Sequence, residues 1–184
     1  MGVWCRLSLV ALAAAGSFVL TACLSNEDRA TTTSRAPTKS LRAHGVHIEI
    51  PAGWDGRVDW PSRDYVRTVH LASFRLPSRI DGRGHAAERR MRPGDVYINM
   101  AIESALQASP PLSKLEIRRS HLTSEWEGKV PEAAVRASRH ALVDGRSIQI
   151  WVTFGSAPTD AVLWSVNRIV ETLVVETAAA TANT

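Results

Sequence analysis

The chain has 184 residues, of which 45% are hydrophobic and 22% are charged, and its formal net charge at pH 7 is +4. This length suits one ordinary domain with terminal segments. The basic excess is mild, with 22 basic against 18 acidic residues, and 19 of the basic residues are arginines. This mild excess argues against nucleic-acid binding, because that function needs a denser basic face with aromatic platforms.

The first element in chain order is a targeting segment. Arg6 precedes an apolar run of 14 residues, Leu7 to Leu20. The run suits a signal peptide and is shorter than the roughly 20 residues of a membrane-spanning helix. The next residues, Leu-Thr-Ala-Cys at 20–23, resemble the lipobox of bacterial lipoproteins. We therefore expect a signal peptide over residues 1–22 and lipidation of Cys23; the alternative is an ordinary secretory peptide in which this cysteine is incidental.

Lipidation of Cys23 would determine the location of the protein and would make the lipid bilayer its first partner. Two or three fatty chains, such as palmitate, anchor a protein stably to a lipid bilayer, whereas one chain gives marginal binding. We expect an extracytoplasmic protein held on the cell membrane by its N-terminal lipid. Cys5 would leave with the signal peptide, so the mature chain would lack the thiols for a disulfide, a cysteine nucleophile or a cysteine-ligated zinc site.

Composition divides the mature chain into three parts. Residues 24–43 are rich in Ser, Thr, Ala and scattered charges, with no periodic apolar face, so residues 23–43 are predicted to be the lipidated cysteine and a flexible tether. Residues 44–176 form the predicted single globular domain. The last eight residues, 177–184, are predicted to be a disordered tail.

Alternating apolar and polar residues predict strands in the first half of the domain. Residues 46–50 alternate, and a hairpin turn is expected at Asp55-Gly56, with return through Val58 and Trp60. A third strand is expected in residues 66–77, ended by Pro77. The clearest alternation, "DVYINMAIES", predicts a strand from Asp95 onward.

The second half continues this pattern and adds a helix. "KLEIRR" at 114–119 is a short strand candidate, and Asp144-Gly145 marks a hairpin between two longer strands. Thr159 or Asp160 is placed to cap a helix whose apolar residues recur at spacings of three and four. "TLVVE" at 172–176 is interpreted as a turn followed by a final strand.

These elements predict an α+β fold, an antiparallel sheet with a C-terminal helix and further helical cover. "HIEIPAGW", "ASFRLP", the long hairpin and "VNRIVETLVV" together resemble the PsbP/Mog1-type α/β/α domain, in the order also found in actinobacterial lipoproteins of uncharacterised function. The resemblance covers most of the mature domain and implies a binding, assembly or accessory module without a common catalytic set. A small β-sandwich with an appended helix is the alternative fold.

Few residues suggest catalysis. His47 and Glu49 lie on the polar face of one predicted strand and are weak candidates for a metal site or an acid–base pair, but no third ligand is identifiable. The other histidines lack metal-site spacing, and the serines lack the Gly-x-Ser-x-Gly pattern of a nucleophile elbow. We therefore assign no catalytic residue, no metal and no cofactor.

The segment Arg75 to Asp95 is a long connection between two predicted strands, and such connections are often functional. Its arginines suit phosphate or carboxylate groups of lipids or wall polymers. A solvated loop that keeps the protein soluble near an anionic surface is the simpler interpretation. The six arginines are Arg75, Arg79, Arg83, Arg89, Arg90 and Arg92.

Aromatic residues complete the predicted contact. Trp151 falls on the polar face of its strand and Trp60 lies beside a turn, so each either packs under a covering element or lines a groove. The predicted ligand-binding set is Arg75, Arg89, Arg90, Trp60, Tyr97 and Trp151.

Two functions of different class follow. The first is a non-catalytic envelope lipoprotein that binds a protein partner or an anionic amphiphilic ligand. The second is a metal-dependent or hydrolytic envelope enzyme that uses His47, Glu49 and another histidine. The binding function is preferred, and convergence of the named groups in space discriminates the two.

Overall fold

The computed structural model describes residues 37–60, 66–81, 83–103, 115–124, 132–143 and 145–176. The chain divides into a unit of residues 1–34 and a unit of residues 35–184. The predicted signal peptide, Cys23, residues 24–36 of the predicted tether and the tail 177–184 lie outside the described residues.

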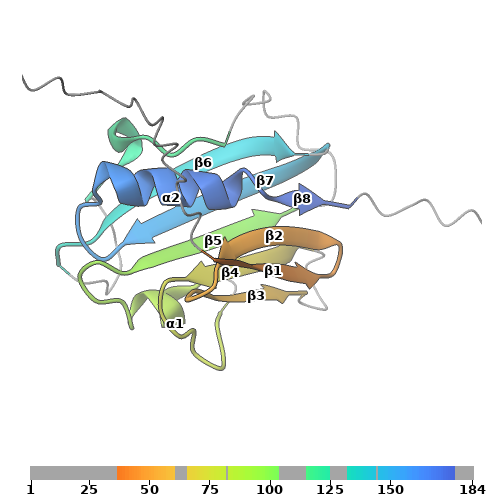
Figure 1. Cartoon of the computed structure of the whole chain (residues 1–184), viewed down its shortest axis with the longest axis horizontal. Coiled ribbons are helices and arrows are strands. Elements are labelled where there is room, and N and C mark those ends of the chain that lie inside the picture. The colour runs from red at the N-terminus through yellow and green to blue at the C-terminus, as the bar shows by residue number, and fades with distance from the viewer. Residues whose placement is uncertain are drawn as a thin grey trace, which may run out of the picture. The chain divides into compact units, whose positions relative to one another are not determined.

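The larger of two sheets has five antiparallel strands in the order β3-β4-β5-β7-β6 (Figure 1). In β5 and β7 the core residues recur at every second position, which sends one set of side chains into the core and the other to the opposite face. The strands are β3 (Asp55–Asp59), β4 (Arg67–Ala72), β5 (Val96–Ile102), β6 (Val135–Val143) and β7 (Arg146–Phe154).

The smaller sheet has three antiparallel strands, β1 (Thr38–Ala43), β2 (Val46–Pro51) and β8 (Val174–Val175). The central strand β2 is the only one of the three that alternates strictly between buried and half-buried residues. The predicted end of the flexible tether at residue 43 is wrong. Residues 38–43 form strand β1, so the folded domain begins at residue 38 or earlier rather than at residue 44.

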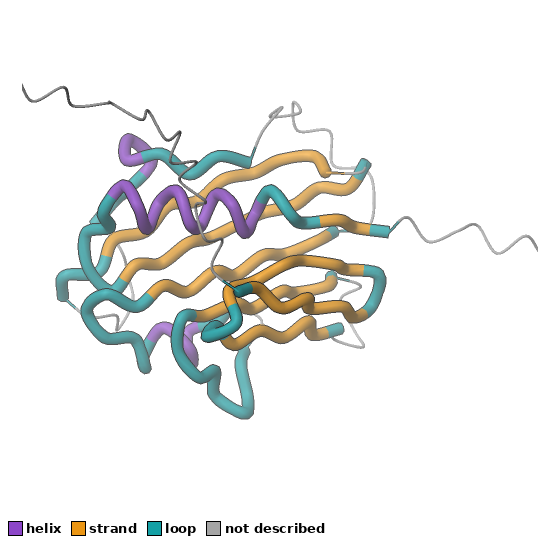
Figure 2. The backbone as a smooth tube through the Cα atoms, viewed as in Figure 1, coloured by secondary structure: helices purple, strands orange, loops and turns teal. Residues whose placement is uncertain are grey.

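The helix α2 (Asp160–Val170) begins at the predicted cap, where the Thr159 hydroxyl accepts a hydrogen bond from the Val162 amide. Its apolar side packs with β2 on one face of the larger sheet (Figure 2). The Thr172 hydroxyl then binds backbone groups of Glu49, which ties the end of α2 to β2. Among the described residues, no helix is long and apolar enough to cross a membrane.

The opposite face of the larger sheet is partly covered by the short helix α1 (His85–Glu88) and the segment around it. A second, smaller apolar core forms there from Ala72, Leu76, Ala87, Met91 and Tyr97. A 3₁₀ turn, η1 (Arg119–His121), lies near β6. The described residues therefore form a mixed α+β fold built mainly from antiparallel strands.

Two sequence predictions about local structure are wrong. Asp55 and Gly56 lie within β3 rather than in a hairpin turn, because β2 and β3 belong to different sheets and the chain turns earlier, at residues 52–53. Residues 115–118 form no strand. Instead, the backbone of Ile117 is hydrogen-bonded to the side-chain amide of Asn167 on α2, and this contact buries Ile117.

The strand predicted over residues 66–77 is confirmed only in its first part, because β4 ends at Ala72 and the chain up to Pro77 is a loop. The other predicted elements are confirmed. The β5 strand, the β6–β7 hairpin, α2 and the final short strand β8 all occur where their patterns place them. Asp144 of the predicted turn lies outside the described residues.

Candidate functional site

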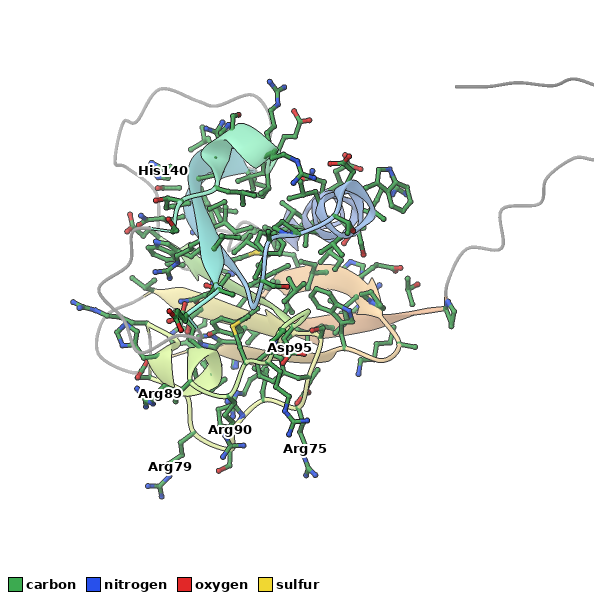
Figure 3. All side chains as sticks on the ribbon, turned by 90° about the vertical axis from the view of Figure 1, so that its left-hand side faces the viewer. Arg75, Arg79, Arg89, Arg90, Asp95 and His140 are labelled. Atoms are coloured by element: carbon green, nitrogen blue, oxygen red, sulfur yellow. The ribbon has the colours of Figure 1, made fainter. Side chains whose placement is uncertain are left out.

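The candidate site is the connection between β4 and β5, residues 73–95, which we call the arginine loop. Antiparallel neighbours can be joined by two residues, so a connection of this length carries a structure of its own. All six of its arginines are exposed, and none forms an ion pair or side-chain hydrogen bond with another residue in the described part of the chain. Figure 3 shows Arg75, Arg79, Arg89 and Arg90 projecting away from the sheet on one side.

The first half of the arginine loop is fixed by β3. The carboxylate of Asp55 accepts a hydrogen bond from the Leu76 amide at 2.9 Å. The guanidinium of Arg57 donates to the carbonyls of Pro77 and Ser78 at 3.0 and 2.9 Å. These bonds hold the backbone beside Arg75 and Arg79 in one position, although both arginine side chains remain exposed.

The second half is fixed by a buried charge. Glu88, in the last position of α1, is 2% exposed and accepts a hydrogen bond from the Thr153 hydroxyl at 2.8 Å. Its Oε1 also lies 3.4 Å from Nη2 of the buried Arg136 on β6. Burial lowers the pKa of Arg136, and the Glu88 carboxylate opposes this shift. Because a buried charge is tolerated only with a partner, this pair ties α1 to two strands.

Two glycines let the arginine loop approach the sheet closely. Gly84 has a φ of 80°, and a Cβ there would collide with the Tyr97 hydroxyl. Gly155, just after β7, has no room for a Cβ because the Arg92 carbonyl lies against it. The Gly155 amide also donates to the Asp95 carbonyl at 2.8 Å. The backbone of the loop is therefore packed directly on the sheet and presents its arginines from a fixed support.

Beneath the loop lies a buried polar pair, His70 on β4 and Tyr97 on β5. The His70 Nδ1 lies 2.7 Å from the Tyr97 hydroxyl, and Nε2 lies 3.7 Å from the Asp59 carboxylate. Burial raises the pKa of Tyr97, with Glu88 and Asp81 adding to the effect, so this hydroxyl stays protonated. Burial lowers the pKa of His70 to about 4, against the opposing influence of Asp59. We assign the Tyr97 hydroxyl as the donor to the neutral imidazole, with the Nε2 proton directed toward Asp59.

This pair predicts that acid destabilises the protein. The pKa of His70 is lower in the folded chain than the unfolded value of about 6.5, so between pH 6.5 and 4 the unfolded chain binds more protons. The stabilisation is complete above pH 6.5 and is lost as the pH falls toward 4. We expect a loss of about 3 kcal/mol in the free energy of unfolding. Urea titrations of wild type and His70→Asn at several pH values measure this loss. Between pH 6.5 and 4, the free energy of unfolding should fall more steeply with decreasing pH in wild type than in His70→Asn. The same pH dependence in both proteins would contradict the prediction.

The structure does not gather the six predicted ligand-binding residues. Arg75, Arg89 and Arg90 lie together on the exposed loop, but Tyr97 is 0% exposed and supports the loop from below, which corrects its prediction as a ligand contact. Trp60 directly follows β3, whereas the loop attaches at Asp55 at the other end of this strand. Five residues of extended chain separate Trp60 from Asp55, which is about 17 Å.

The two tryptophans have separate surroundings. Trp60 is 50% exposed and packs against the His44 ring and the Arg67 guanidinium. Trp151 is half-buried in the middle of β7, between Asn99 and Ser138. Trp60 does not join the arginines, because the loop leaves the sheet at the other end of β3 and β4. Trp151 lies on the face of β7 that also carries Thr153, the hydrogen-bond partner of Glu88, and belongs to the sheet beneath the loop.

The predicted pair His47 and Glu49 lies on the half-buried side of β2. The Glu49 carboxylate accepts a hydrogen bond from the Thr38 hydroxyl of the neighbouring strand β1. Within the described ranges, no group of three His, Cys, Asp or Glu residues is arranged to hold a metal ion.

The sequence did not predict one pair of side chains that lie in a catalytic geometry. His140 Nε2 on β6 lies 2.6 Å from the hydroxyl of Ser147 on β7. Such a distance is typical of a nucleophile and its base. The signal was present in the hairpin, because a turn at residues 144–145 places these two residues diagonally on one face of the paired strands.

Comparison with known proteins returned no family. No protein-family model, no curated protein and no solved structure matches this chain. We therefore infer the function from the arginine loop and the residues that support it.

Proposed function

We propose that the protein is a membrane-anchored envelope lipoprotein whose domain is a non-catalytic binding module for an anionic ligand or partner. The binding surface is the arginine loop, with Arg75, Arg79, Arg89 and Arg90 at its centre. The ligand class is an amphiphile or polymer that carries phosphate or carboxylate groups, for which a guanidinium offers paired, charge-assisted hydrogen bonds.

One observation carries this proposal: the loop is fixed, but its charges are not neutralised. Three of its anchors are polar side chains, namely the half-buried Asp55 and Arg57 and the buried Glu88. The six exposed arginines take no part in that support and have no carboxylate partner in the described part of the chain. A cationic surface held this way loses little entropy when an anion binds, which favours binding.

A calorimetric titration tests the ligand class. The mature chain with Cys23→Ser, which cannot be acylated, is titrated with dihexanoyl phosphatidylglycerol and, separately, with dihexanoyl phosphatidylcholine. We expect binding of the anionic lipid that weakens with added salt, and no binding of the zwitterionic lipid. Equal binding of both lipids, or of neither, would argue against an anion-binding surface and leave a protein partner as the ligand.

Membrane anchoring makes a separate prediction at Cys23. In a bacterial host, the full chain should partition with the membrane fraction and incorporate labelled palmitate. Cys23→Ser should remove the label and release the protein from membranes, because no other cysteine remains after residue 22. Cys5→Ser is the matched control and should change neither property. Retention of the label in Cys23→Ser would disprove the lipobox assignment.

The PsbP/Mog1-like resemblance belongs to the same proposal. Its support is the order of the elements, in which an opening strand precedes an antiparallel sheet and α2 leads directly into the last strand, β8. Helix α2 on one face and the α1 segment on the other are compatible with an α/β/α arrangement. An accessory or assembly role is what that resemblance implies.

The hydrogen bond between His140 and Ser147 favours a second candidate, a hydrolase that uses Ser147 as nucleophile. Ser147 is 4% exposed, so a substrate would have to displace whatever covers it. A fluorophosphonate probe tests this function: labelling in wild type, absent in Ser147→Ala and retained in Ser156→Ala, would establish an activated serine. An unlabelled wild type would exclude it.

A further inference from the structure

We infer that the anionic partner of the arginine loop is the headgroup layer of the same bilayer that holds the lipid anchor. This inference rests on the proposed function and adds a partner and an orientation to it. Its basis is where the anchored end of the chain enters the folded domain.

The entry point lies beside the arginine loop. The carbonyl of Pro37, the first described residue, accepts a hydrogen bond from the Ala52 amide at 2.9 Å. Three residues further, the Asp55 carboxylate accepts its hydrogen bond from Leu76, the neighbour of Arg75. The start of β1 and the start of the arginine loop are therefore joined through one short turn of the chain.

The opposite terminus leaves the domain elsewhere. The amide of Glu176 donates to the carbonyl of Gly45 at 2.8 Å, in the turn between β1 and β2. Pro37 lies opposite Ala52 and Glu176 lies opposite Gly45, so the two residues lie beyond opposite ends of β2, about 23 Å apart along the strand. In Figure 1, β8 and the segment that carries α1 lie at opposite sides of the view.

The length of chain outside the described residues limits how far the domain can move from the membrane. Thirteen residues separate Cys23 from Pro37, so the fully stretched span is about 50 Å. A domain held this way meets the bilayer at an effective concentration of the order of millimolar. Headgroup contacts that are weak in free solution are then sufficient to orient it.

The positive charge of the arginine loop also favours an anionic membrane surface as its partner. A cluster of four to eight basic residues beside a membrane anchor binds anionic lipid, with about 1 kcal/mol from each side chain near the surface. The arginine loop has six arginines against three acidic residues, and of these Glu88 is buried with Arg136. A lipid chain and a basic surface are the two signals that together hold a protein firmly on a bilayer.

The test uses the single thiol of the mature chain. Cys23 is coupled to a maleimide lipid in vesicles of phosphatidylcholine, with or without phosphatidylglycerol, and the arginines are then modified with phenylglyoxal and read by mass spectrometry. We expect Arg75, Arg79, Arg89 and Arg90 to react several-fold more slowly on the anionic vesicles. Arg118 and Arg168, which lie on other elements and pair with Glu116 and Glu171, are the internal controls and should react equally on both vesicles.

Moving the anchor distinguishes a specific orientation of the domain on the membrane from a general attraction between the domain and the anionic lipid. In the double variant Cys23→Ser, Thr184→Cys, the same lipid is attached beyond β8, at the other end of β2. We expect the protection of the loop arginines to fall to less than half. Equal protection for both anchors, or none with Cys23, would overturn the inference. If the short-chain anionic lipid still binds in solution while protection is absent, the proposed function stands and only the orientation is wrong.

Discussion

Replacing Arg75, Arg79, Arg89 and Arg90 together with glutamine is expected to lower the binding constant for phosphatidylglycerol vesicles about a thousandfold. Each basic side chain near an anionic surface contributes about 1 kcal/mol, so four contribute about 4 kcal/mol. The four side chains are exposed and form no ion pair or side-chain hydrogen bond within the described part of the chain, so the fold should be unchanged. Vesicle co-sedimentation of the unacylated Cys23→Ser protein measures the effect, and urea unfolding verifies the fold.

The matched control carries the same change in net charge elsewhere. Arg42, Arg118, Arg119 and Arg168 are also exposed, and the last three pair with Glu116, Asp160 and Glu171. Their replacement with glutamine should weaken vesicle binding less than tenfold, through the general loss of charge. A similar loss in both quadruple variants would show that binding depends on net charge and not on the arginine loop.

Glu88→Ala is expected to lower the free energy of unfolding by about 3–5 kcal/mol, because the buried guanidinium of Arg136 then loses the Glu88 carboxylate. The substitution also deprives the Thr153 hydroxyl of its acceptor. Glu88→Gln keeps an oxygen for that hydroxyl and should cost less. Urea titration measures both variants at pH 7.

An exposed ion pair gives the control for this prediction. Glu171 lies 3.1 Å from Arg168 at the surface of α2, and such pairs contribute about 1 kcal/mol or less. Glu171→Ala should therefore leave stability nearly unchanged. If Glu88→Ala cost no more than Glu171→Ala, Glu88 would not be an anchor of the arginine loop, and the claim of a fixed cationic surface would fail.

The elements that the sequence predicts best are those whose pattern is complete within one segment. Strand β5 alternates over seven residues, and β6 and β7 pair as a hairpin on either side of the predicted turn. Helix α2 has both a cap at Thr159 and a continuous apolar face. In each case local conformation and burial favour the same structure, so tertiary context has nothing to override.

The wrong predictions concern segments whose structure is determined by tertiary contacts. Strand β1 is an edge strand with only Leu41 and Ala43 half-buried, so its sequence resembles a polar linker. Asp55 and Gly56 have the composition of a turn. They lie in β3 because the Asp55 carboxylate binds the loop and because Gly56 leaves room for Ile50, Leu41 and Leu71.

The candidate site also contains features that the sequence predicts and features that it does not. The length of the arginine loop and its six arginines are visible in the sequence, and their exposure follows from the hydration of guanidinium groups. The supports are not visible, because Glu88 meets Arg136 and Thr153 only after α1 folds back on the sheet. The same closure covers Tyr97, which alternation alone places on an open polar face.

The most direct test of the central claim is the side-chain Nε–Hε spectrum of the arginines in a nitrogen-15-labelled mature chain. Dihexanoyl phosphatidylglycerol is added below its micellar concentration, and the resonances are assigned by single Arg→Lys substitutions. A fixed anion-binding loop predicts that the signals of Arg75, Arg79, Arg89 and Arg90 shift together along one binding curve while those of Arg118 and Arg168 stay in place. Shifts confined to arginines outside the loop, such as Arg67 beside Trp60, or no shifts at all, would contradict it.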